Sequence, residues 1–322
     1  MFQEKQLGIY QVKLPLPLKL NHVNCYAIQG DQGWSIIDTG LNTKQCKEAW
    51  LEFMAAYHIK PSDIKEIYLT HFHPDHYGAA GWLQDLSGAP VYISKLDAVA
   101  VNRFWVDAGE EKIVSVLFAE HGMPQELIDG IVHTLGRMLL PIRPHPRLSI
   151  VQPNQTVQLG NYAYQIIMTP GHSDGHICFY NQENGLLFSG DHLLSKITSN
   201  ISYWHESAPN PLGNYLESIK ANCKLDCRLV LPAHGEVFHN LQERGRQLEV
   251  HHAGRLKVMF NLAAGGATAY EICKQAFKEG LSFHELQFAM SETLAHLVFL
   301  VARGDLKVEN YGGIYQYCKK SF

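Results

Sequence analysis

The sequence predicts an α/β fold of four layers, in which two β-sheets face each other and helices cover their outer sides. Strand-like apolar runs alternate with amphipathic helical stretches up to residue 94, and the same plan returns from about residue 147. Two such halves fit an αββα sandwich. From Leu241 the pattern becomes helical, so we expect a first domain over 1–240 and a C-terminal helical domain over 241–322.

The composition is that of a globular protein with a large core. The chain has 322 residues, 46% of them hydrophobic and 18% charged, with a net charge of −4 that favours neither nucleic acid nor a membrane surface. Its seven cysteines form no paired framework. It shows neither an export signal nor 18 consecutive apolar residues, so we expect a cytoplasmic protein without a membrane anchor.

The first half contains five predicted strands and two helices. Thr43 is the expected N-cap of a helix that reaches about His58, with Trp50, Leu51, Phe53 and Met54 on its inner face. The second helix covers 78–87. The strands are expected at 7–14, 23–30, 33–38, 65–70 and 89–94, with a hairpin turn at 30–33.

Residues 95–146 interrupt this plan with a helical insertion. Apolar residues recur every three or four positions in Gly109–Glu120 and Pro124–Leu140, which predicts two helices. Pro141, Pro144 and Pro146 indicate an extended linker after them. We expect the insertion to cover the functional site; the alternative is an exposed elaboration remote from it.

The remaining elements complete the second half and the C-terminal domain. A loop is expected at 193–210 and a helix over Leu212–Ala221. Three further helices, Leu241–Ala264, Thr268–Phe277 and Ser282–Arg303, precede a hairpin around Tyr311-Gly312-Gly313. The strands of the second half are expected at 149–151, 155–159, 161–168, 176–180, 185–189 and 228–231.

One hexapeptide carries most of the predicted chemistry. His71-Phe72-His73-Pro74-Asp75-His76 holds four potential metal ligands and directly follows an apolar strand. The alternative is a histidine-rich surface turn, because the chain contains 18 histidines. Four more candidates, Asp38, His172, Asp191 and His234, also follow apolar runs. Side chains at strand ends in layered α/β folds gather around ligands and metals.

The order and spacing of these five motifs resemble the metallo-β-lactamase superfamily. The resemblance implies the αββα architecture and a pair of metal ions, with His71, His73 and His172 on the first, Asp75, His76 and His234 on the second, and Asp191 bridging. Zinc suits these ligands best, and manganese or iron also fit. The C-terminal region resembles the winged-helix appendage of a branch that includes lactamase-like protein 2.

Other side chains are expected around the metals. The resemblance implies that Asp38 lies beneath the site and accepts a hydrogen bond from a ligand histidine or a backbone group; a helix cap before Thr43 is the alternative. His192 is expected beside the ligands rather than among them. Weaker candidates for substrate contact are His176, Tyr203, Trp204 and His205, the last three of which follow Asp191 in the long loop.

The expected function is metal-dependent hydrolysis. Two ions would activate a hydroxide that attacks an ester, thioester or lactone bond of a small to medium substrate, and Asp75 would be the catalytic base. The alternative is a single-strand endoribonuclease or phosphodiesterase that uses the same two ions, since RNA binding would fit a winged helix. The expected partners are a small-molecule substrate and, less favoured, RNA; a homodimer stays open and no membrane partner is expected.

Overall fold

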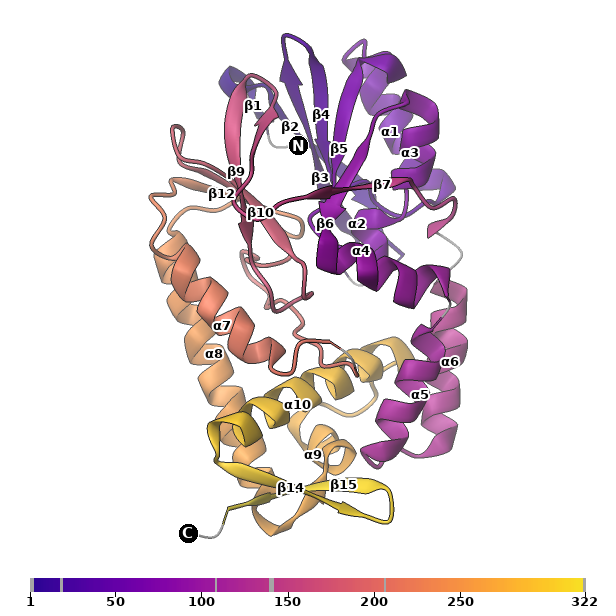
Figure 1. Cartoon of the computed structure of the whole chain (residues 1–322), viewed down its shortest axis with the longest axis vertical. Coiled ribbons are helices and arrows are strands. Elements are labelled where there is room, and N and C mark those ends of the chain that lie inside the picture. Colours follow the sequence, from indigo (N-terminus) through magenta and orange to yellow (C-terminus); the bar gives the residue numbers. More distant parts are fainter. Residues whose placement is uncertain (1–2, 18–19, 108, 139–141, 206, 321–322) are drawn as a thin grey trace.

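A computed structural model of the chain describes residues 3–17, 20–107, 109–138, 142–205 and 207–320. Two β-sheets face each other in the upper half of the molecule, and helices cover their outer faces (Figure 1). A group of helices with a small third sheet forms the lower half (Figure 1). This architecture confirms the predicted αββα sandwich with a C-terminal helical region.

The first sheet runs from antiparallel pairing to parallel pairing. Its first four strands pair antiparallel, and β4 to β7 pair parallel. Parallel neighbours require crossovers, and helices α1 (Lys44–Ala56) and α3 (Ala80–Ser87) supply two of them. The strands in spatial order are β1 (Gln3–Glu4), β2 (Ile9–Pro15), β3 (His22–Gly30), β4 (Gly33–Ile37), β5 (Ile64–Tyr68), β6 (Val91–Ser94) and β7 (Leu148–Val151).

Helices on the outer face of this sheet bury its apolar side chains. Helix α1 (Lys44–Ala56) begins at Thr43, whose side chain accepts a hydrogen bond from the Cys46 backbone N–H. Trp50, Phe53 and Met54 are buried as expected, whereas Leu51 is 48% exposed. The helices after β5 are α2 (Pro74–Tyr77), α3 (Ala80–Ser87) and α4 (Lys95–Val101), and short 3-10 turns lie at Lys5–Leu7 and Pro61–Asp63.

The second sheet supplies the other half of the sandwich. Tyr26 of the first sheet packs on Phe188 of the second, with ring centroids 5.0 Å apart, so aromatic side chains fill the space between the sheets. Helix α7 (Pro211–Asn222) precedes the last of its strands in the chain, and α8 (Leu241–Leu262) follows that strand. The strands in spatial order are β12 (Leu229–Pro232), β11 (Leu186–Gly190), β10 (Ile177–Asn181), β9 (Tyr162–Met168) and β8 (Thr156–Leu159).

The insertion differs from its prediction in one respect. The two expected helices are present as α5 (Glu110–Glu120) and α6 (Gln125–Met138), but α4 and a π-helix at Asn102–Val106 precede them and were not predicted. Helices α5 and α6 share a core with α10 (Phe283–Arg303), which lies beside them in Figure 1. The first predicted linker proline, Pro141, lies outside the described residues.

The C-terminal region combines capped helices with a small sheet. Thr268 and Ser282 begin α9 (Ala269–Ala276) and α10 (Phe283–Arg303), each in a capping box with the glutamate three residues later. A 3-10 turn at Ala263–Gly265 follows α8. The sheet has the order β13 (Ala267–Thr268), β15 (Ile314–Lys319) and β14 (Leu306–Tyr311). Within the described part of the chain, every helix is too short or too polar to cross a lipid bilayer.

Candidate metal centre

The seven predicted ligands come together at the ends of strands from both sheets. The hexapeptide 71–76 follows β5, and His172 follows β9. Asp191 and His234 follow β11 and β12, two parallel strands whose ends lie at the same edge. Three overlapping groups result, within each of which the potential ligand atoms lie within 4.8 Å of one another: His71–His73–His172, His71–His76–Asp191 and Asp75–His76–His234.

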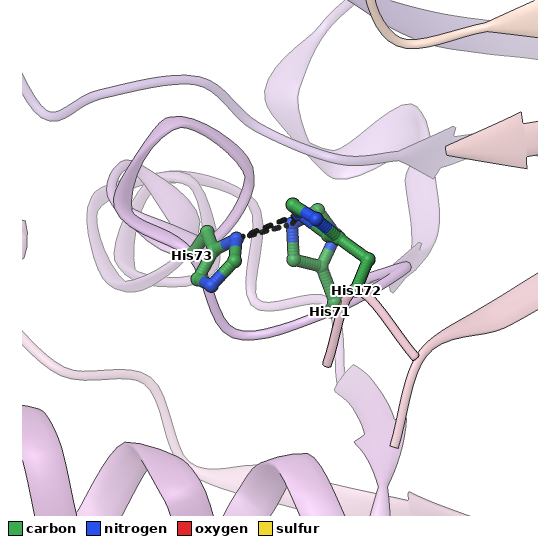
Figure 2. Close-up of side chains that lie close together, drawn as sticks. All are labelled: His71, His73 and His172. Atoms are coloured by element: carbon green, nitrogen blue, oxygen red, sulfur yellow. Dashed lines mark hydrogen bonds between the residues drawn. The ribbon is translucent and has the colours of Figure 1, made fainter. Parts of the chain in front are cut away.

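Three imidazoles form the first group and face one another (Figure 2). His73 Nδ1 lies 3.0 Å from His71 Nε2 and 2.9 Å from His172 Nε2, and the two Nε2 atoms are 3.2 Å apart. His172 Nδ1 lies 2.7 Å from the Asn200 carbonyl oxygen, which only accepts, so this nitrogen carries the proton. The lone pair of His172 therefore points at the other two rings.

This spacing fits a bound metal ion. A tetrahedral zinc ion with Zn–N distances of 2.0–2.1 Å holds its ligand nitrogens about 3.3 Å apart. The three nitrogen–nitrogen distances of 2.9–3.2 Å are close to that value. Imidazole lone pairs directed at one point repel each other unless a cation lies between them. The first group is therefore suited to a divalent ion.

Asp75, His76 and His234 form the second group, which combines two imidazoles with a carboxylate. His234 Nε2 lies 3.2 Å from Asp75 Oδ2, and His76 Nε2 lies 3.7 Å from the same oxygen. His234 Nδ1 donates to the His22 carbonyl oxygen at 3.1 Å, so in the neutral ring the lone pair lies on Nε2. His76 Nε2 is buried and has no hydrogen-bond partner among the described residues. A buried polar atom without a partner is costly, and a cation between these groups would remove that cost.

Asp191 lies between the two groups. Its Oδ1 is 3.5 Å from Nε2 of both His76 and His234, and its Oδ2 is 3.5 Å from His172 Nε2. One carboxylate thus reaches both groups with different oxygens. This is the arrangement that a ligand shared by two ions requires.

The electrostatics of the two groups differ. Burial holds the pKa of His71 well below its usual range, and neighbouring imidazoles lower it further, so this ring stays neutral. Burial also acts to lower the pKa of His76, but the carboxylates, Asp75 first, outweigh it and raise the pKa to about 10. Against the same effect of burial, Asp191 and then Asp75 raise the pKa of His234 to about 9. The carboxylates thus draw positive charge to the second group.

Asp38 holds the base of the site. His76 Nδ1–H donates to Asp38 Oδ2 at 2.8 Å, and the Thr70 backbone N–H donates to Asp38 Oδ1 at 2.8 Å. The Thr70 hydroxyl lies 2.8 Å from Asp38 Oδ2 and 3.0 Å from His71 Nδ1. Asp38 is 1% exposed and has a φ of +60°, a backbone conformation that Asp and Asn adopt more readily than most residues. Asp38 thus orients a ring of each group.

Asp97 connects two of the loops that carry candidate ligands. The sequence did not predict this role. The Asp97 carboxylate accepts from the Phe72 backbone N–H at 3.0 Å, the Ser173 hydroxyl at 2.8 Å and the Gly175 backbone N–H at 2.8 Å. The first bond holds the hexapeptide, and the other two hold the loop of His172. The preceding Ser94, which caps α4, was the available signal, because it marks a helix start directly after β6.

His176 lies beneath the ligands, which corrects its expected place in contact with substrate. The ring is completely buried, its Nε2 accepts from the Asp191 backbone N–H at 3.1 Å, and its Nδ1 lies 2.7 Å from the Thr169 hydroxyl. A side chain enclosed in this way supports Asp191 and presents no surface to a substrate. His192 is also completely buried and belongs to none of the three groups.

A small cavity beside the first group shows which loop residues face the site. It has a volume of about 100 Å³ and touches His73 and His172. Trp204, Ser202 and Ser207 of the long loop line it, whereas Tyr203 and His205 do not. His205 Nε2 instead lies 2.8 Å from Oε2 of Glu120 in α5. The other lining residues are Phe72, Leu96, Val99, Ala100, Arg103, Phe104, Gly171, Ser173 and Asp174.

Comparison with known families gives two matches along the chain. Residues 18–234 match the family model described as "Metallo-beta-lactamase superfamily". Residues 256–320 match the one described as "Metallo-beta-lactamase-like, C-terminal domain". The first match covers each of the seven clustered side chains and Asp38.

Similar proteins span nearly the whole chain. The "Probable metallo-hydrolase YqjP" of Bacillus subtilis (strain 168) is 27% identical over 308 residues, which are 91% of this chain and 92% of that protein. A crystal structure of a metallo-beta-lactamase family protein from Thermus thermophilus is 30% identical, with a TM-score of 0.87 over 97% of this chain and 99% of that one. A beta-lactamase domain protein from Burkholderia ambifaria is 26% identical, with a TM-score of 0.86 over 97% and 92%.

Proposed function

The chain belongs to the metallo-beta-lactamase superfamily and is a metallo-hydrolase with a C-terminal domain of the family's own type, and we propose that it cleaves an ester, thioester or lactone bond of a small acyl substrate. The observation that carries the substrate class is the small cavity beside His73 and His172, whose walls include Phe72, Phe104 and Trp204. Bound acyl groups need apolar walls, and the bond to be cleaved must lie at the metals.

We propose that the seven clustered side chains hold two divalent ions in the two groups described, and that these ions are zinc. When bound, such ions polarise a carbonyl group and lower the pKa of a shared water toward about 7. Asp75, whose side chain is 20% exposed, would accept the proton of the attacking water. The water oxygen bonds to the carbonyl carbon, the bond to the oxygen or sulfur leaving group breaks, and the leaving group takes up a proton.

The cavity walls support a short acyl group. Phe72 and Phe104 stack with ring centroids 5.3 Å apart, and the ring centroids of Trp204 and Phe104 are 6.4 Å apart. Arg103 lines the same cavity and could pair with a carboxylate or phosphate on the substrate. Pockets for drug-sized ligands have volumes of about 300–1,000 Å³. The cavity of about 100 Å³ is smaller, so only part of the substrate would enter it.

The alternative, cleavage of single-stranded RNA, has less support. Proteins that bind single strands combine a basic groove with aromatic platforms for successive bases. Arg103 is the only lysine or arginine among the described residues that line this cavity. The order of C-terminal elements, α8, β13, α9, α10, β14 and β15, fits a winged helix, and we propose that identity for the region after residue 240. In this chain it would shape the metal site rather than bind RNA.

One experiment tests the proposed activity. The purified protein is stripped with a chelator, reloaded with zinc, and incubated with short acyl thioesters, esters, lactones and a labelled single-stranded RNA. We expect two equivalents of metal per chain and hydrolysis of an acyl substrate that requires them. Full activity in the stripped protein would contradict a metal-dependent reaction, and RNA cleavage without acyl hydrolysis would favour the alternative.

A matched pair of variants tests the role of Asp75. Asp75→Ala should remain folded and lose at least about 100-fold in rate, because it removes a proposed ligand together with the base, and general-base catalysis alone contributes about 10²–10⁴-fold. Asp85→Ala removes an exposed aspartate of α3 and should leave the rate unchanged. Equal activity in both variants would rule out Asp75 as the base.

A further inference from the structure

The ligand candidate His172 depends on a loop for its orientation. Its Nδ1–H donates to the carbonyl oxygen of Asn200 at 2.7 Å. Asn200 lies in the long loop that follows Asp191, 28 residues after His172 in the chain. The loop must therefore be held in place for the His172 lone pair to face the other imidazoles.

Helix α10 of the C-terminal domain holds this loop. The Asn200 side-chain amide lies 3.4 Å from the Phe288 carbonyl oxygen and 3.4 Å from Glu292 Oε2. Two residues further on, the Ser202 hydroxyl lies 3.0 Å from the Ser291 hydroxyl. The Tyr203 backbone N–H donates to the Ser291 carbonyl oxygen at 3.2 Å. Neighbouring residues of α10 thus hold the loop by both side-chain and backbone hydrogen bonds.

The rest of the C-terminal domain fixes Glu292 in turn. Arg255 of α8 places its Nε 3.8 Å from Glu292 Oε1. The guanidinium lies 4.1 Å above the ring of Phe277 and donates to the Ala276 carbonyl oxygen at 2.9 Å. The side chains of Glu292 and Arg255 are only 15% and 19% exposed, so solvent screens their interaction weakly. A chain of contacts thus runs from α8 and the end of α9, through α10, to His172.

Two other candidate ligands, His76 and His234, donate their ring N–H to acceptors outside the C-terminal domain. His76 donates to Asp38, and His234 donates to the His22 carbonyl oxygen, both of them near the start of the chain. His172 therefore differs from them, because its acceptor is held by the region after residue 240.

We propose that Asn200 and Glu292 are positioning residues for metal binding, through which the C-terminal domain orients His172 toward the first ion. The inference rests on the proposed function, in which His172 is a ligand. Partners of this kind fix the tautomer and the ring orientation, and their loss typically costs about 10–100-fold in metal affinity. The effect should fall on the group of His71, His73 and His172 and spare the group of Asp75, His76 and His234.

Variants of the Asn200–Glu292 pair test the proposal. Asn200→Asp places a carboxylate against that of Glu292 and should weaken one of the two zinc sites by about 10-fold. Combining it with Glu292→Gln restores a donor–acceptor pair in the opposite sense, and the affinity should return toward that of the wild type. Thr293→Val is the control, since this buried hydroxyl donates to the Ala289 carbonyl oxygen within α10 rather than to the loop.

The readouts are zinc affinity by competition with a chromophoric chelator, the visible spectrum of the cobalt-loaded protein, and the melting temperature without metal. Loss at one site in Asn200→Asp, recovery in the double variant and unchanged affinities in Thr293→Val would support the proposal. Wild-type affinities in Asn200→Asp, or equal losses in Thr293→Val, would overturn it. A wild-type protein that binds no metal would instead refute the proposed function, and the inference with it.

Discussion

The interaction between Asp38 and His76 allows a sharp test of how the protein prepares its metal site. Asp38→Asn keeps the size of the side chain and tolerates the φ of +60°, but its amide nitrogen cannot accept a hydrogen bond. Asp38 Oδ1 and Oδ2 together accept from the Thr70 backbone N–H, the Thr70 hydroxyl and His76 Nδ1. If the new NH₂ group takes the place of Oδ1, the Thr70 backbone N–H loses its acceptor. If it takes the place of Oδ2, it faces His76 Nδ1, and His76 must move its proton to Nε2.

Both outcomes have calculable costs. A buried donor left without an acceptor costs about 1–3 kcal/mol, which should appear in the unfolding free energy of the metal-free protein. A proton on His76 Nε2 removes its lone pair from the second group, and loss of such support typically weakens metal binding about 10–100-fold, or about 1.4–2.7 kcal/mol. Urea denaturation in chelator measures the first cost, and zinc competition measures the second. An unchanged unfolding free energy together with two unchanged zinc affinities in Asp38→Asn would refute the role that we assign to Asp38.

Three further predictions concern stability, specificity and the backbone. Burial raises the pKa of Glu110 from 4.5 to about 7. The protonated carboxyl therefore stabilises the folded protein, fully so below pH 4.5, and this contribution of up to about 3 kcal/mol is lost as the pH rises through about 7. Glu110→Gln should remove this loss, and a variant whose melting temperature keeps the wild-type pH dependence between about 5 and 8 would contradict it. Trp204→Ala opens the cavity wall and should raise kcat/KM for longer acyl chains relative to acetyl by about 10-fold; an unchanged preference in a chain-length series would exclude Trp204 from the acyl site. A Cβ at Gly190, where φ is +50°, would lie 2.7 Å from His176 Nε2, so Gly190→Ala should displace Asp191 and lower the zinc stoichiometry, which metal analysis of the dialysed protein checks.

The clustering of the predicted ligands could be foreseen because each lies next to a strand end. Regular alternation of strands and helices brings such ends to one edge of a sandwich, so local sequence carries this information. The same reasoning predicted that Tyr203, His205 and His176 lie near substrate, and of these His176 is completely buried. Whether a loop residue faces a cavity depends on the side chains that pack around the loop, such as Glu120 against His205.

The residues that support the ligands could not be foreseen from the sequence. Asp97 and Glu292 belong to no motif, and each acts through bonds to residues far away in the chain: Asp97 to Ser173, and Glu292 to Asn200. Helix α4 was missed because Lys95–Val101 follows β6 without a turn, although Leu96 and Val99 line the cavity. A short helix has too few residues for its period to be recognised.

By itself, the sequence determined the αββα class, the order of most of its strands and helices, and the set of candidate metal ligands. These features follow from hydrophobic period, capping residues and residue chemistry, all of which act over a few neighbouring positions. Only the tertiary structure decided which ring nitrogen of His172, His76 and His234 faces the site, and that α10 contacts the loop whose Asn200 carbonyl oxygen accepts from His172. Those properties depend on hydrogen bonds between residues distant in the chain, which no local pattern contains.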